Sequence, residues 1–324
     1  MKKMITFFVV LWMLLLTGCQ KDESPDRTAV NEREPLVIWS YYETQAQQDS
    51  LDWLVNTFNI SQNEYTASWE YVPMTDFTKK LTMAYTEEAL PDIALLDNPN
   101  MMDCIQMGMC EDMTDVLLEL NVDKNYYPAT LETVTYEEKM YGLPAVCNNL
   151  ALIYNRQLLE AAGVQPPQTW EELKEAAKRL TDGETKGFLI SAKEGEQGAF
   201  QLLPWILSTG EQTDHIGGAG TQQAFAYLNE LMQEGYMTKN CVNLSQTDVA
   251  IAFIQGETAI MENGPWVLAM LDASGIDYGI CRLPEDEKSC SIVGGEDFAV
   301  MKGKNVDGAK AFFRFYNQNQ IIGK

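Results

Sequence analysis

Two carboxylates and one tryptophan in this sequence lie where chemistry or binding would need them. Glu43 directly follows the apolar run "PLVIWSYY", and Asp97 ends the apolar run "PDIALLD". Two carboxylates that meet in one cleft can act as the acid and the base of glycoside hydrolysis. Trp266 follows the run "ETAIMEN" after a Gly-Pro turn, and an indole offers a broad, flat surface at little conformational cost. These residues indicate either a catalytic cleft or a binding cleft.

The other reactive side chains argue against catalysis and against a metal site. The sequence shows no nucleophile and base in a recognisable arrangement and no phosphate-binding loop. The single histidine lies in the glycine-rich segment "TDHIGGAG", and no two cysteines form a CxxC pair, so we expect neither a metal nor a cofactor. Disulfides are permitted outside the cell, where Cys104 with Cys110 or Cys281 with Cys290 could pair, but a buried free cysteine serves equally well as a small apolar residue.

Alternating strand-like and helix-like periods predict the elements that position these residues. The first part of the chain has the pattern βαβαβ, which is typical of a mainly parallel sheet covered by helices. Its expected elements are strands at 35–42, 65–72 and 91–97 and helices at 51–58 and 76–88.

The second part repeats this plan. A capping box of Thr169 and Glu172 should open a helix that runs to Leu180, Gly163 should close the preceding helix, and Thr247 should open another. The expected strands are 150–155, 187–192 and 257–263, with a further helix at 222–235. Trp266 then lies just past the carboxyl end of a strand, which is the edge where open α/β sheets bind ligands.

The amino terminus predicts export and anchoring. Residues 1–18 combine two lysines with an apolar run too short for a comfortable membrane span, followed by Leu-Thr-Gly-Cys, which is typical of a signal peptide ending in a lipobox. An uncleaved membrane anchor is the alternative. Cleavage before Cys19 would leave a thiol for a diacylglycerol anchor on the outer face of a bacterial membrane. Residues 19–35 are polar and aperiodic, so we expect a flexible tether, with folded structure from about Leu36.

The charge excludes some classes of partner. The chain has 23 basic and 47 acidic side chains, a formal net charge of −24. Nucleic acids and anionic lipid surfaces require local positive charge, so neither is an expected partner.

The length of the chain predicts two lobes. About 290 residues lie beyond the tether, which is too many for one ordinary core and about right for two.

Four sequence blocks resemble the family 1 extracellular solute-binding proteins of ABC transporters. "YGLPAVCNNLALIYNRQLLEAAGVQPPQTWEEL" is similar to one family signature, and "FIQGETAIMENGPW" is similar to a second, particularly to that of maltose-binding proteins. "PDIALLDNP" and "GGEDFAVMKGKNVDGAKAFFRFY" look like two further blocks. The blocks stand in family order over most of residues 36–316.

The resemblance implies a fold of the α/β class with the two-lobe periplasmic-binding-protein (Venus-flytrap) architecture, type II-like, with an interlobe hinge. It places lobe 1 at 36–145 plus 293–324 and lobe 2 at 146–292. The first crossover is expected near Leu143 to Cys147 and the return near Cys290 to Gly295. A ligand would have to contact both lobes, because only a higher affinity for the closed state can shift the equilibrium toward it.

The resemblance also implies ligand-binding residues at the ends of strands. Trp266 matches the family tryptophan that stacks on a sugar ring, with a core tryptophan pinned by the preceding proline as the alternative. Glu43 matches an acidic position that accepts hydrogen bonds from sugar hydroxyls, or it is an exposed carboxylate at a helix N-terminus. Tyr41 and Tyr42 lie beside it, and one of them should face the cleft.

Two pairs of polar residues complete this set. Asp97 and Asn98 end a strand where the family often has polar cleft groups, although Asn98 before a proline could simply form a turn. Asn148, with Asn149 beside it, occupies a crossover position where some members have a glutamate, and an amide can both donate and accept.

The remaining candidates come from a variable loop and from the return crossover. Phe200 and Trp205 are the two aromatic candidates of the segment "SAKEGEQGAFQLLPW", and Trp205 either faces the ligand or packs beneath the loop. Gly295 and its glycine neighbour would allow close backbone approach, and Glu296 or Asp297 could then point inward.

This cleft is expected to be aromatic, rich in amides and acidic, which disfavours an anion. A carbohydrate, as a mono- or oligosaccharide, is therefore the leading ligand, and a polyamine or another organic cation is the nearest alternative. The protein is then a monomeric binding protein that contacts the membrane through its lipid anchor only and delivers its ligand to the permease subunits of an ABC importer. A carbohydrate-active enzyme is the alternative from another class.

The chain departs from the family pattern at its end. It stops after "AFFRFYNQNQIIGK", whereas family members continue through a third crossover and further helices of the second lobe. We therefore expect lobe 2 to lack C-terminal helices, with lower stability and weaker ligand affinity as the consequence. A cooperative unfolding transition at high temperature would contradict that expectation.

Overall fold

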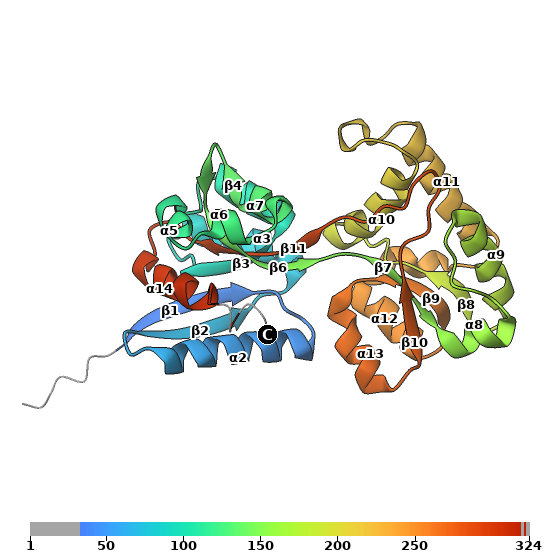
Figure 1. Cartoon of the computed structure of the whole chain (residues 1–324), viewed down its shortest axis with the longest axis horizontal. Helices are drawn as coiled ribbons and strands as arrows, with labels where there is room; N and C mark the ends of the chain where they lie inside the picture. The colour runs from blue at the N-terminus through green and yellow to red at the C-terminus, as the bar shows by residue number, and fades with distance from the viewer. Residues whose placement is uncertain (1–32, 319–320, 322–324) are drawn as a thin grey trace, which may run out of the picture.

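Two separate β-sheets organise the part of the chain that the computed structural model describes, residues 33–318 and 321. Each sheet is covered by helices and forms its own lobe, and two extended segments cross between the lobes (Figure 1). The predicted signal peptide, Cys19 and most of the predicted tether lie outside the described residues. Among the described residues, no helix combines the length and the apolar character needed to cross a bilayer.

The first lobe contains a five-stranded sheet in the order β2-β1-β3-β11-β6. Strand β1 is parallel to β2 and β3, whereas β11 is antiparallel to β3 and β6. Its elements are β1 (Glu34–Ser40), α2 (Gln45–Ser61), β2 (Tyr65–Tyr71), α3 (Met74–Thr86), β3 (Ile93–Asp97), α4 (Asn98–Gln106), α5 (Thr114–Glu119), α6 (Val122–Asn125), α7 (Pro128–Val134), β4 (Thr135–Tyr136), β5 (Lys139–Met140), β6 (Gly142–Asn148), β11 (Gly294–Val300) and α14 (Val306–Tyr316).

The core of this lobe has two layers, one on each face of the sheet, because side chains along the central strands point alternately to the two faces. Leu36 and Ile38 of β1 pack with Phe58 of α2 and Phe312 of α14 on one face of the sheet. Trp39, one residue out of phase, packs on the other face with side chains of α3 and α4. Because successive side chains of a strand point to opposite faces, one apolar run serves both layers.

The second lobe contains a four-stranded sheet in the order β10-β7-β9-β8. In contrast to the expected parallel plan, only β8 and β9 are parallel, and β7 is antiparallel to both of its neighbours. Its elements are β7 (Ala151–Asn155), α8 (Arg156–Ala162), α9 (Trp170–Leu180), β8 (Lys186–Leu189), α10 (Glu196–Ser208), η1 (Thr213–His215), α11 (Ala219–Gln233), η2 (Lys239–Asn243), α12 (Gln246–Ile254), β9 (Thr258–Asn263), η3 (Pro265–Val267), α13 (Leu268–Ser274) and β10 (Tyr278–Cys281).

Strand direction explains why the chemically interesting residues meet between the lobes. Strand β7 starts where the chain enters the second lobe, so its amino end faces the first lobe. Because β9 runs opposite to β7, the carboxyl end of β9 faces the first lobe. In the first sheet, β11 enters from the crossover, so the carboxyl ends of its antiparallel neighbour β3 and of β1 face the second lobe.

Local capping differs from the sequence-based expectation at two helices. The Thr169 side chain accepts from the backbone N–H of Glu172, but the Glu172 carboxylate accepts from Gln168 N at 2.7 Å, so the predicted capping box is only half formed. Helix α12 begins at Gln246 and is capped by a Ser245–Asp248 box, so Thr247 does not open it. The earlier serine is the stronger N-cap, because Ser generally outranks Thr at that position.

The six cysteines of the described residues are free thiols. Cys104 of α4 and Cys110, which follows that helix, are buried in the apolar layer on one face of the first sheet. Burial raises the pKa of the Cys104 thiol to about 12. These two residues therefore act as small apolar side chains in the core.

Candidate binding site

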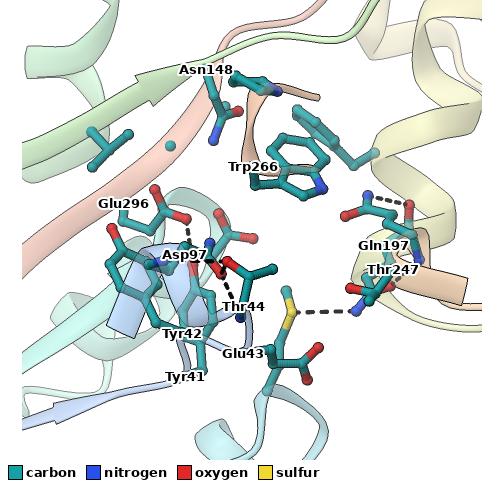
Figure 2. A pocket seen from close by; sticks show the side chains of 18 of the residues that line it. Tyr41, Tyr42, Glu43, Thr44, Asp97, Asn148, Gln197, Thr247, Trp266 and Glu296 are labelled. Carbon is teal, nitrogen blue, oxygen red and sulfur yellow. Dashed lines mark hydrogen bonds between the residues drawn. The ribbon is translucent and has the colours of Figure 1, made fainter. Parts of the chain in front are cut away.

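A cavity of about 350 Å³ lies between the two lobes. From the second lobe it is lined by Glu196, Gln197, Phe200, Gln246, Thr247, Pro265 and Trp266. From the first lobe and the crossovers it is lined by Tyr41, Tyr42, Glu43, Thr44, Gln47, Ser50, Met74, Asp97, Val146, Asn148, Gly294, Gly295 and Glu296. This volume is within the range of small-molecule sites. Figure 2 shows Trp266 and Asn148 on one side, with Glu296, Asp97 and Tyr42 across from them.

The first-lobe wall combines tyrosines with carboxyl groups. Tyr41 and Tyr42 follow β1 and are buried, and the Tyr41 hydroxyl donates to Glu296 Oε1 at 3.2 Å. Burial raises the pKa of Glu296 to about 7, although the Tyr41 hydrogen bond favours the charged form. Burial raises the pKa of Asp97 above its usual value, and the neighbouring carboxyl groups of Glu196 and Glu296 raise it further. A carboxyl group with a raised pKa can donate a hydrogen bond as well as accept one.

The start of α2 fixes this wall in place. Thr44 caps the helix, its backbone N–H donates to Gln47 Oε1 at 3.1 Å, and its hydroxyl accepts from Gln47 N at 3.3 Å. This reciprocal pair holds the turn that follows β1. Glu43 is consequently exposed at the mouth of the cavity, next to the two buried tyrosines.

The second-lobe wall is aromatic. Trp266 lies just after β9, and its ring centroid is 6.3 Å from that of Phe200, at an interplanar angle of 49°. The indole folds back over Gly264, where an added Cβ atom would come within 2.0 Å of the ring. The glycine of the Asn-Gly-Pro turn is therefore needed for the position of the Trp266 ring, although its backbone angles are ordinary extended ones.

Hydrogen bonds tie the polar part of this wall together and reach across to the first lobe. Gln246 N donates to Gln197 Oε1 at 3.0 Å, and Asn263 Nδ2 donates to Gln246 O at 2.9 Å. Asn100 Nδ2 of α4 donates to Glu196 Oε2 at 3.2 Å, so the first lobe contacts the start of α10. The structure therefore has the two lobes in contact around the cavity.

The crossovers form the floor of the cavity. Gly294 pairs with Asn148, and Gly295 pairs with Cys147, so the two crossing segments form an antiparallel ladder. Gly295 has φ of +144°, and a Cβ atom there would lie 1.9 Å from Val146 O. Only glycine fits this combination of backbone angle and close approach.

Three buried atoms of the lining have no hydrogen-bond partner among the described residues: Asn148 Oδ1, Glu196 Oε1 and Trp266 Nε1. Buried polar atoms in native proteins are nearly always paired with protein, water or ligand. One donor and two acceptors are thus available to a polar molecule in the cavity.

Most of the residues predicted from the sequence line this cavity, and three do not. Asn98 instead donates to Asp297 Oδ2 at 2.9 Å, behind the cavity wall. Asn149 is exposed on the crossover. Trp205 is 2 % exposed in the core of the second lobe, where its Nε1 donates to Glu262 Oε2 at 2.6 Å. Trp205 therefore packs in the core and does not line the cavity.

The burial of Glu262 beside Trp205 leads to a testable prediction about how the stability of the protein depends on pH. Burial raises the pKa of Glu262 well above its usual value, so the folded state holds a proton that the unfolded chain loses above about pH 4.3. The unfolded state then binds fewer protons, and the contribution of Glu262 to folding falls as the pH rises toward its folded pKa. Glu262→Gln cannot ionise. The difference in free energy of unfolding, variant minus wild type, should therefore increase with pH, by up to about 1.4 kcal/mol per pH unit between pH 5 and 8.

Urea unfolding at several pH values measures this difference. Glu257→Gln, an exposed glutamate just before the same strand, is the matched control and should show no such trend. An offset between Glu262→Gln and wild type that does not change with pH would show that Glu262 is not held protonated.

Most of the residues that sequence reasoning missed fall into two groups. Thr44, Gln47, Ser50 and Met74 lie at or near the start of the helices after strands whose ends were recognised, so extending each candidate by two helical turns would have found them. Glu196, Gln197, Gln246 and Thr247 start α10 and α12 of the second lobe. No local signal separates these polar side chains from solvent-exposed ones.

Within residues 33–318 and 321, no group of three or more His, Cys, Asp or Glu side chains is arranged to hold a metal ion. No lysine, arginine or histidine of these residues lines the cavity. The cavity is therefore acidic, aromatic and polar.

Comparisons with known proteins agree with this geometry. The family described as bacterial extracellular solute-binding protein matches residues 53–322. The galactooligosaccharide-binding protein of Bacillus subtilis is 22% identical over 305 residues, which cover 90% of this chain and 69% of that protein. A protein of Brucella abortus, whose name describes it only as a binding protein, is 26% identical over 237 residues, which cover 70% of this chain. The chain spans 57% of the length of that relative.

The fold is shared with a solved binding protein. The GacH receptor of Streptomyces glaucescens, whose structures are described unliganded and in complex with acarbose, superposes with a TM-score of 0.80. It is 22% identical, and the match covers 90% of this chain and 77% of the receptor. At this identity the likeness establishes a common fold.

Proposed function

Because the chain belongs to the bacterial extracellular solute-binding proteins, we propose that it captures a carbohydrate between its two lobes and delivers it to the permease of an ABC importer. The observation that carries this proposal is the pairing of an aromatic wall, Trp266 with Phe200, with carboxyl and amide groups across a cavity of about 350 Å³. A sugar presents apolar C–H faces and a rim of hydroxyls, so it needs both kinds of wall.

The polar groups fit hydroxyls better than they fit an anion. Asn148 Oδ1 and Glu196 Oε1 can accept from hydroxyl groups, and Trp266 Nε1 can donate to a hydroxyl or ring oxygen. A phosphate or a carboxylate ligand would require basic donors, and none lines the cavity among the described residues. The proposal thus excludes anionic ligands on the same evidence that favours sugars.

The proposal includes anchoring and partners. Cys19 would carry the lipid that holds the protein, as a monomer, on the extracytoplasmic face of the membrane, with the permease subunits as its protein partners. Both lobes contact the cavity through residues far apart in sequence, so a bound sugar would bridge them and favour the closed form. The ABC permease would then recognise that form.

Binding without catalysis is part of the proposal. Glu43 and Asp97 both line the cavity, but Asp97 interacts with Glu196 from the opposite lobe, and the related proteins named above are described by what they bind or receive. Incubation of a bound oligosaccharide with the protein should produce no new reducing ends. Their growth with time would show that the cavity is a glycosidase site.

Thermal unfolding against a panel of mono- and oligosaccharides tests the proposal. A ligand that binds only the native state stabilises it by RT ln(1 + [L]/Kd), about 2.7 kcal/mol at a hundredfold excess over Kd. At least one sugar should raise the midpoint clearly above the rest. Spermidine belongs in the panel because carboxylates between aromatic walls also suit an organic cation. A shift with spermidine and with no sugar would overturn the sugar proposal.

A further inference from the structure

The two lobes touch beside the cavity at the start of α10. Asn100 Nδ2 of α4, in the first lobe, donates to Glu196 Oε2 at 3.2 Å. Gln197, the next residue of α10, places its Nε2 3.7 Å from Met74 Sδ of α3. Both contacts join the second lobe to helices of the first, so both are lost when the lobes separate.

Two neighbours fix the orientation of the Asn100 amide. Its Oδ1 accepts from Thr78 Oγ1 of α3 at 3.2 Å, and its Nδ2 points to the carboxylate of Glu196. A carboxylate has no hydrogen to donate, so it can pair with the amide nitrogen but not with the amide oxygen. The amide thus links α3 and α4 of the first lobe to α10 of the second.

The two oxygens of the Glu196 carboxylate have different surroundings. Oε2 accepts from Asn100, whereas Oε1 is buried and has no partner among the described residues. Glu196 lines the cavity, and Asn100 lies outside that lining. The bond from Asn100 therefore fixes the rotation of a carboxylate whose second oxygen is left for a ligand.

Acidic neighbours oppose the approach of Glu196 to the first lobe. Asp97 and Glu296 line the cavity from that lobe, and no basic side chain of the described residues lines it. Like charges repel more strongly where water is excluded. The Asn100 amide and the hydroxyl groups of a sugar are neutral donors that offset this repulsion. Because they use separate oxygens of one carboxylate, each bond restricts the rotation that the other also needs restricted.

We propose that Asn100 is a positioning residue of the binding site, which turns Glu196 Oε1 toward the ligand when the lobes close. The proposal rests on the proposed function, and it adds a residue outside the cavity lining that determines affinity. Because the Asn100–Glu196 bond exists only while the lobes touch, it also stabilises the closed form relative to the open one.

Asn100→Ala should weaken binding of the sugar found in the thermal panel by about 10-fold, which is near the lower limit for a hydrogen bond to a charged group. Calorimetry measures the affinity, and thermal unfolding without ligand shows that the variant is folded. Asn125→Ala is the matched control, because Asn125 is an exposed residue of α6 outside the cavity lining. It should leave the affinity unchanged.

A double-variant cycle shows whether Asn100 acts through Glu196. In a protein that already carries Glu196→Ala, replacement of Asn100 by alanine should change the affinity by less than about 2-fold, because no carboxylate remains to be oriented. A residue that only supports the fold would lower the affinity by the same factor in both backgrounds.

Exchange of donor and acceptor provides a rescue. Asn100→Asp places a second carboxylate against Glu196 and should weaken binding by more than Asn100→Ala does. Combining it with Glu196→Gln restores a complementary pair, with the introduced amide as donor and the introduced carboxylate as acceptor, and leaves an amide oxygen for the ligand. The combined variant should bind about 10-fold more tightly than Asn100→Asp alone.

Thr78→Val tests the same arrangement from the exposed side. It removes the hydroxyl that holds the Asn100 amide and should weaken binding by about 3-fold, since a neutral hydrogen bond contributes less than a charged one. Thr78 is exposed, so this variant keeps the proposal testable if Asn100→Ala does not fold.

The outcomes separate this inference from the proposed function. Unchanged affinity in a folded Asn100→Ala protein, an equal loss in both Glu196 backgrounds, or no recovery in the exchanged pair overturns the inference and leaves the proposed function intact. A loss of similar size in Asn125→Ala also overturns it. Binding of spermidine but of no sugar by the unmodified protein, or no binding at all, overturns both.

Discussion

Replacement of Trp266 by alanine should weaken ligand binding by about 30-fold or more while the protein remains folded. Trp266 is only partly buried and lines the cavity, so most of what alanine removes is contact surface for the ligand. Truncation of a central tryptophan anchor typically costs about 2 kcal/mol or more of binding free energy, and each 1.4 kcal/mol is a factor of ten. Calorimetry with the sugar found in the thermal panel measures the loss.

Two further variants separate the possible roles of the indole. Trp266→Phe keeps a flat ring but removes Nε1, so an intermediate loss is expected. Trp53→Ala removes a tryptophan from α2 that is 39% exposed and does not line the cavity, and it should leave the affinity unchanged. Full affinity in a folded Trp266→Ala protein would refute the aromatic-wall assignment.

Replacement of Gly295 by alanine should lower the free energy of unfolding by about 3 kcal/mol or more. The φ of +144° is strained for any side chain, and the added Cβ would lie 1.9 Å from Val146 O. Strain and overpacking cost roughly 1–3 kcal/mol each. The ladder between the crossovers would have to open to relieve the contact, so ligand affinity should fall as well. The urea midpoint, at an unchanged m-value, measures the stability.

Gly303→Ala is the matched control for this prediction. Gly303 also has a positive φ, of +73°, but no atom lies within 4 Å of the position that its Cβ would take. It should cost only the conformational strain, about 1–2 kcal/mol. Equal losses at the two positions would mean that the crossovers tolerate the added atom by a small shift and that their close approach is not required.

The sequence was most informative about strand ends. Tyr41, Glu43, Asp97 and Trp266 each follow or end an apolar run bounded by turn residues, and all four line the cavity. Such runs are local signals, because the period of a strand and the chemistry of a turn depend on neighbouring residues. The side chains just beyond them could therefore be chosen without knowledge of the fold.

The sequence was least informative about helices. Phe200 and Trp205 lie five residues apart on α10, which is about 140° around a helix of 3.6 residues per turn, so they point to different sides. Packing of the second-lobe core places Trp205 inside and Phe200 at the cavity. The sequence analysis placed the cap of α12 at Thr247, whereas Ser245 is the cap and Thr247 lines the cavity.

By itself, then, the sequence determined the α/β class, the strands that lead to the cleft, the aromatic and acidic character of the cleft and the family resemblance, because these depend on local pattern. Only the tertiary structure brought Glu196 of the second lobe to the same cavity as Asp97 of the first, almost one hundred residues away in the sequence. Strand direction turned the carboxyl end of β3 toward the second lobe, and the packing of α10 placed its first turn opposite. Such contacts depend on the geometry of two sheets and two crossovers, which no local period encodes.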